Sequence, residues 1–169
     1  KQAAGVDDLL QQKVKVLLIN PTDSEAAAAS VARATKAGIP VISIDRSVKG
    51  ADVAAHIASD NVAGGKMAAE FIVQQLASGG DIVELEGIPG SSAARERGQG
   101  FHDIMDAQKA IKIVAKQPAD FDRTKGLTVM ENILQSHPNV KAIFAHNDEM
   151  ALGAVKALEA ANKKGVIVV

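Results

Sequence analysis

The sequence contains no cysteine, tryptophan or tyrosine, and its aromatic residues other than histidine are four phenylalanines. The lack of cysteine excludes disulfide bridges, thiolate zinc sites and cysteine nucleophiles, and it fits an oxidising compartment as well as a reducing one. Neither sign of charge predominates, because 19 lysines and arginines stand against 20 aspartates and glutamates. With no basic block to neutralise phosphates, nucleic acid is not an expected partner.

The composition is that of a globular protein, since 47% of the 169 residues are hydrophobic and 23% are charged. This length suits one domain and equally a piece of a two-lobed protein, and no apolar stretch is long enough to span a bilayer. Residues 1–4 have the composition of the middle of a helix, and residues 165–169 that of a buried strand. We therefore expect the sequence to be cut from a longer protein at both ends.

Short β-branched runs alternate with longer amphipathic stretches along the whole chain. Strands are expected at 14–19, 41–44, 56–59, 81–85, 111–116, 140–145 and 166–169, and helices at 25–37, 63–77, 92–107, 122–136 and 148–161. Capping residues support these bounds, for example Asp23 or Ser24 before one helix and Gly38 after it. Repeated strand–helix alternation predicts an α/β fold with doubly wound parallel sheets and helices on both faces.

Several polar residues directly follow the expected strands, where ligands bind in open α/β sheets. Asp45 and Arg46 form either a solvated ion pair or a site for sugar hydroxyls, in which the carboxylate accepts hydrogen bonds and the guanidinium donates them. Asn147 occupies the position of a helix N-cap, and its amide is alternatively able to bind a pair of hydroxyls. The sequence leaves both alternatives open.

Two further residues stand out by their position. Arg97 lies early in a predicted helix, where a cation opposes the macrodipole, so a purely surface role explains it less well. Phe121 lies in a polar loop between Asp120 and Asp122. A loop aromatic of this kind either stacks on the apolar face of a sugar ring or fills the edge of a core.

Signatures of catalysis are mostly missing. The turn at 87–91 matches neither a nucleophile elbow nor a phosphate-binding loop, and Gly64-Gly65-Lys66 lacks the earlier glycine of such a loop. The four histidines show no metal-ligand spacing, so we expect them to be structural or solvated. The sequence therefore predicts a protein that is not an enzyme and needs no cofactor or metal.

Five segments, read in order, resemble one known family. They are INPTDS at 19–24, IASDN at 57–61, SAARERG at 92–98, QPADFDR at 117–123 and NDEMALGA at 147–154. With the Asp45-Arg46 pair between the first two, they resemble the ribose-binding proteins of bacterial ABC importers in one register along essentially the whole chain. The effector-binding domains of sugar-responsive repressors share this fold and several of these turns. One departure is His146, where a member of the ribose-binding family has glutamine.

The resemblance implies a fold of the type I periplasmic-binding-protein kind, of which this chain is an internal fragment. Residues 1–59 would form part of the first lobe and 60–169 most of the second, with a hinge crossing near 58–61. The sugar contacts implied are Asp45, Arg46, Arg97, Phe121 and Asn147.

The function implied is binding of D-ribose or a similar pentose in a cleft between the lobes, by hydrogen bonds and aromatic stacking, in the periplasm. The partners implied are the membrane permease of an ABC importer and, in addition, a chemoreceptor. The alternative is the sugar-sensing effector domain of a repressor-type transcription regulator.

Overall fold

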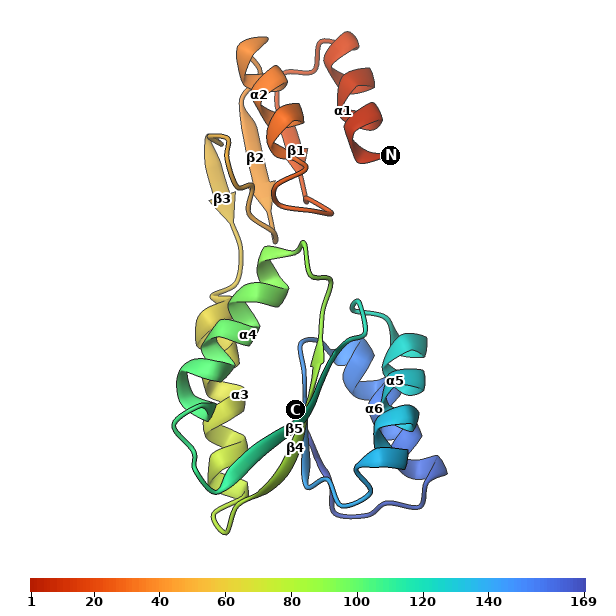
Figure 1. Ribbon diagram of the computed structural model, residues 1–169. Coiled ribbons are helices and arrows are strands. Elements are labelled where there is room, and N and C mark those ends of the chain that lie inside the picture. The colour runs from red at the N-terminus through yellow and green to blue at the C-terminus, as the bar shows by residue number, and fades with distance from the viewer. The chain divides into compact units, whose positions relative to one another are not determined.

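The computed structural model describes all residues from Lys1 to Val169, and the chain forms two compact units (Figure 1). The first unit comprises Lys1–Asp60 together with Gly90–Ala93, and the second comprises Asn61–Pro89 together with Ala94–Val169. All paired strands in both units are parallel, which confirms the predicted α/β class. No helix has both the length and the apolar character needed to cross a membrane.

The first unit contains two helices and a three-stranded sheet. Its elements are α1 (Gln2–Gln11), β1 (Leu17–Ile19), α2 (Ala28–Lys36), β2 (Val41–Ile44) and β3 (Ala55–Ile57), and the strand order is β1-β2-β3. One face of the sheet forms a core with the two helices, in which Val6, Val31 and Val41 are buried. On the opposite face Leu18 and Ile57 are 60% and 62% exposed, so this apolar surface has no covering helix in the chain.

The second unit is a four-stranded sheet with helices on both faces (Figure 1). Its elements are α3 (Asn61–Gln75), β4 (Gly80–Glu86), α4 (Ser92–Met105), β5 (Ile111–Pro118), α5 (Arg123–Ser136), β6 (Ala142–Ala145), α6 (Asp148–Ala160) and β7 (Ile167–Val168), and the strand order is β5-β4-β6-β7. Ile72 of α3 and Phe101 of α4 are buried on one face, and Met130 of α5 and Met150 of α6 on the other. This is the doubly wound arrangement that the alternating pattern predicted.

Most differences from the predicted elements lie at their ends. The helix expected from residue 25 begins at Ala28, because Glu25 and Ala26 donate their backbone N–H groups to Asp23 Oδ1 in a preceding turn. The strand expected from residue 14 begins at Leu17, after Lys13 has taken a positive φ of 56° at the end of α1. Gly38 has a φ of 76° directly after α2, as its predicted role at the helix end requires.

Candidate functional site

The sheet of the second unit brings three strand ends together at one edge. In the parallel ladder Glu86 lies beside Pro118, and Leu85 lies beside Ala145. The chain continues the ladder past these ends, since Ala119 N–H donates to the Glu86 carbonyl over 2.8 Å and His146 N–H donates to the Leu85 carbonyl over 3.0 Å. The loops after β4, β5 and β6 are therefore neighbours, and they carry Gly87, Phe121 and Asn147.

Asn147 caps α6. Its side-chain Oδ1 accepts a hydrogen bond from Met150 N–H at 3.0 Å, so the capping interpretation of this residue is confirmed. The amide nitrogen donates to the carbonyl of Phe121 at 3.4 Å, which ties the β5 and β6 loops together. A contact between this amide and a ligand stays a prediction.

Phe121 lies across the end of β4. An added Cβ at Gly87 would overlap the Phe121 ring, so a side chain at position 87 would require the ring to move from this place. Phe121 has a φ of 60° and the preceding Asp120 has a φ of 54°. Two successive non-glycine residues in the left-handed region carry backbone strain, which is often found at binding sites.

Arg97 is fixed from two sides. Its Nε donates to Asn61 Oδ1 at 2.9 Å, and its Nη1 donates to the backbone carbonyl of His146. Asn61 in turn donates from its amide nitrogen to Glu96 Oε2 at 3.1 Å. The guanidinium is half-buried at the same edge as Phe121 and Asn147, whereas Arg95 on the same helix is exposed.

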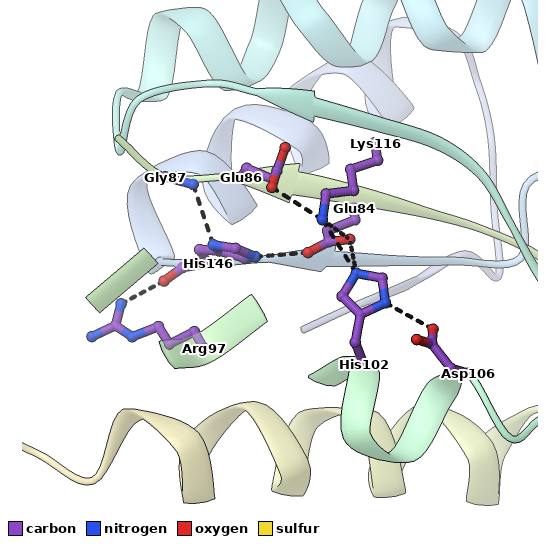
Figure 2. A network of polar contacts seen from close by, with 8 residues as sticks. All are labelled: Glu84, Glu86, Gly87, Arg97, His102, Asp106, Lys116 and His146. Atoms are coloured by element: carbon purple, nitrogen blue, oxygen red, sulfur yellow. Dashed lines mark hydrogen bonds and ion pairs between the residues drawn. The ribbon is translucent and has the colours of Figure 1, made fainter. Parts of the chain in front are cut away.

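A buried carboxylate connects this edge to the interior of the unit (Figure 2). Glu84 is fully buried, and its Oε1 lies 3.0 Å from His146 Nε2 while its Oε2 lies 2.9 Å from His102 Nε2. Lys116 Nζ lies 3.6 Å from Glu84 Oε2 and 3.2 Å from Glu86 Oε1. Every charged partner of Glu84 is therefore a side chain that is cationic or able to become so.

These neighbours govern the titration of the network. Burial by itself would raise the pKa of Glu84, but the hydrogen bond with His146 and the charges of His102 and Lys116 lower that pKa below its usual value. Burial would likewise lower the pKa of His102, but Asp106, whose Oδ1 lies 2.8 Å from His102 Nδ1, and Glu84 raise it. Glu84 is thus held as an anion inside the protein.

The network around Glu84 was not expected from the sequence. Glu84 interrupts the apolar run 82–85 of the predicted strand at 81–85, and a charged residue inside a buried strand needs a partner. That interruption was a usable signal, although it does not say which residue the partner is. His146 was expected to be a structural or solvated histidine, and at 2% exposed it is a buried, hydrogen-bonded one.

In the first unit the polar residues gather where β1 and β2 end. Asn20, after β1, donates from its amide to Asp45 Oδ2 at 3.1 Å. Asp45 has a φ of 66°, and its Oδ2 lies 3.8 Å from Arg46 Nε in an ion pair. Arg46 Nη1 donates a hydrogen bond to the carbonyl of Pro21 at 3.3 Å. An ion pair between Asp45 and Arg46 is therefore present, and its neighbour Asn20 is among the polar residues that follow the first expected strand.

Comparison with known proteins finds a family match over the whole chain. The model of the family described as periplasmic binding protein domain matches residues 1–169. The chain belongs to this family. The resemblance and the fold inferred from the sequence are thus both confirmed.

Ribose import binding proteins are among its relatives. That of Bacillus subtilis strain 168 is 55% identical over 99% of this chain and 54% of its own length, and that of Escherichia coli K12 is 53% identical over 100% and 57%. A D-apiose import binding protein of Actinobacillus succinogenes is 38% identical over 100% of this chain and 55% of its own length. The chain spans about half the length of the curated relatives it matches. These relatives are binding proteins of import systems, in agreement with the prediction that the chain is not an enzyme.

Solved structures agree with this placement. The Caulobacter myo-inositol binding protein bound to myo-inositol has a TM-score of 0.94 at 37% identity, covering 99% of this chain and 58% of that one. A periplasmic solute binding protein from Actinobacillus succinogenes with bound D-allose has a TM-score of 0.88 at 34% identity, covering 98% and 62%. Proteins of this fold thus bind differing polyols and sugars, so the fold does not by itself specify the ligand.

Proposed function

We propose that the protein to which this chain belongs is the substrate-binding component of a bacterial ABC importer, acts in the periplasm, and binds D-ribose or a similar pentose without changing it chemically. The observation that carries the proposal is the 53–56% identity to ribose import binding proteins over essentially the whole chain. The matched 99–100% of the chain covers the loops that carry the candidate site.

The chemistry of the candidate residues suits a sugar. A guanidinium and an amide, from Arg97 and Asn147, supply donors in fixed directions, and Phe121 offers an aromatic surface for the C–H face of a ring. In the first unit Asp45 is an acceptor for hydroxyl protons and Arg46 a donor to hydroxyl oxygens. We assign all five residues to the sugar site, and we assign the chain crossing near 58–61 to a hinge between the part-lobes 1–59 and 60–169.

The partner proposed is the membrane permease of the importer. The import binding proteins among its relatives favour this receptor role over the alternative of a repressor effector domain. Presentation of the loaded protein to a chemoreceptor stays a prediction from the family resemblance.

Isothermal titration calorimetry on the full-length protein tests the proposal. The ligand panel should contain D-ribose, D-apiose, D-allose and myo-inositol, each with and without a metal chelator. The expected result is tightest binding of D-ribose with no effect of the chelator. Tighter binding of another sugar would overturn the assignment of ribose, and no binding of any sugar would overturn the receptor role itself.

A further inference from the structure

The two ring nitrogens of His146 have different partners (Figure 2). Nδ1 lies 3.3 Å from the backbone nitrogen of Gly87, and Nε2 lies 3.0 Å from Glu84 Oε1. A backbone N–H is only a donor, so Nδ1 accepts, and the ring proton therefore resides on Nε2 and is donated to Glu84. The imidazole is thus fixed in one tautomer between two strand ends.

The backbone of the same residue holds the candidate arginine. The carbonyl of His146 accepts from Arg97 Nη1, and the next residue is Asn147, the cap of α6. The ring itself packs against α4, because an added Cβ at Gly98 would lie 3.2 Å from His146 Cε1. Displacement of His146 would therefore move the backbone carbonyl that orients Arg97.

We propose that His146 is a positioning residue of the sugar site, which orients Arg97 through its backbone carbonyl while Glu84 and Gly87 hold its ring. This inference rests on the proposed function, since it assumes that Arg97 contacts the sugar. A guanidinium fixed before the ligand arrives has less side-chain freedom to lose on binding, and supporting residues of this kind commonly affect affinity without touching the ligand.

The donor and acceptor pattern of the ring makes the role testable by conservative replacement. A glutamine amide has one acceptor oxygen and donor hydrogens on nitrogen, as the neutral imidazole has an acceptor Nδ1 and a donor Nε2. His146→Gln can therefore bond both Gly87 N–H and Glu84. His146→Ala removes both bonds and leaves the Glu84 carboxylate without its partner on that side.

The test is D-ribose titration of the full-length protein in four forms: wild type, His146→Ala, Arg97→Ala and the variant with both substitutions, with His146→Gln as the rescue. We expect His146→Ala to weaken binding about tenfold, or about 1.4 kcal/mol, and His146→Gln to bind within about threefold of wild type. In the Arg97→Ala background His146→Ala should add little, because its effect passes through Arg97. If His146 is needed only for folding, its substitution should lower the melting temperature without this non-additive loss of affinity.

Outcomes separate the two proposals. Wild type that binds no sugar overturns the proposed function, whereas wild-type affinity in His146→Ala, or fully additive losses in the double variant, overturns the positioning role alone. If His146→Ala does not fold, His146→Leu fills the space of the ring without its two hydrogen bonds, and Glu84 keeps His102 and Lys116 as partners. The same tenfold loss is then expected, and unchanged affinity would overturn the role.

Discussion

Glu84 Oε1 and His146 Nε2 lie 3.0 Å apart in a hydrogen bond between two side chains that are 0% and 2% exposed. The two residues come from neighbouring strand regions, the interior of β4 and the end of β6 (Figure 2). A buried carboxylate is tolerated only when its partners replace the water it has lost, and Glu84 has His102 and Lys116 as further partners. Loss of this hydrogen bond should therefore affect both the stability of the second unit and the positions of the loops at its strand ends.

The first prediction concerns stability against pH. The folded-state pKa of Glu84 is lowered, so its contribution is present above the unfolded value of about 4.3 and is lost as pH falls through the folded pKa. The folded-state pKa of His102 is raised, so its contribution is complete below about 6.5 and is lost as pH rises through the folded pKa. For these two groups stability should be greatest between about pH 4.3 and 6.5.

Urea unfolding of wild type, Glu84→Gln and His102→Gln, from below about pH 4.3 to above about pH 6.5, checks the prediction. Glu84→Gln should flatten the decline on the acid side, and His102→Gln should flatten the decline on the alkaline side. Glu70→Gln, at an exposed position on α3, is the control that should leave both slopes as in wild type. Equal slopes in all four proteins would contradict the charge assignment of the network.

The second prediction uses two adjacent glycines of α3. An added Cβ at Gly65 would overlap the carbonyl of Arg97 and lie 2.9 Å from the backbone nitrogen of Phe101, whereas nothing lies within 4 Å of one at Gly64. Gly65→Ala should therefore push α3 away from α4 and destabilise the protein by about 1–3 kcal/mol. Gly64→Ala should stabilise it by about 0.5–1 kcal/mol, because alanine favours the helix. Chemical denaturation measures both, and a similar effect of the two changes would disprove the close helix contact.

The third prediction separates the two roles of Asn147. The carboxylate introduced by Asn147→Asp keeps an oxygen able to cap α6, so this variant should retain the stability that the cap contributes, while Asn147→Ala should lose about 1 kcal/mol. Neither variant keeps the amide donor. If that amide contacts the sugar, both variants of the full-length protein should bind D-ribose at least about tenfold more weakly, which corresponds to about 1.4 kcal/mol. Wild-type affinity in Asn147→Asp would show that the residue serves as a cap and not as a ligand contact.

The fourth prediction compares two arginines on one turn of α4. Charge-assisted hydrogen bonds contribute about 1.5–3 kcal/mol each, so Arg97→Ala in the full-length protein should weaken D-ribose binding at least about tenfold. It should also lower stability without sugar, because Arg97 bonds Asn61 and the His146 carbonyl. Arg95→Ala, at an exposed position, is the matched control and should leave affinity near wild type. Equal effects of the two substitutions on the affinity measured by calorimetry would show that Arg97 does not contact the sugar.

Local features of the fold were accessible from the sequence because they depend on neighbouring residues. Hydrophobic periodicity marked the strands and the helices from α2 onward, and Gly38 and Asn147 marked helix ends, since capping involves residues only a few positions apart. The ordered motifs from 19–24 to 147–154 identified the family for the same reason, as each motif is contiguous. Bounds such as Ala28 for α2 were less accessible, because the side chain of Asp23 competes with the helix for the same N–H groups.

What the sequence determined by itself was therefore the α/β class, the order of elements, the family and the candidate residues at strand ends. Only the tertiary structure decided that β4 lies between β5 and β6, and hence that Glu84 meets His146 from a position 62 residues away along the chain. It also decided that the backbone of His146 holds Arg97 and that Gly87 makes room for Phe121. Strand order and side-chain packing arise from contacts between distant segments, and no local pattern specifies which partner a buried polar group will find.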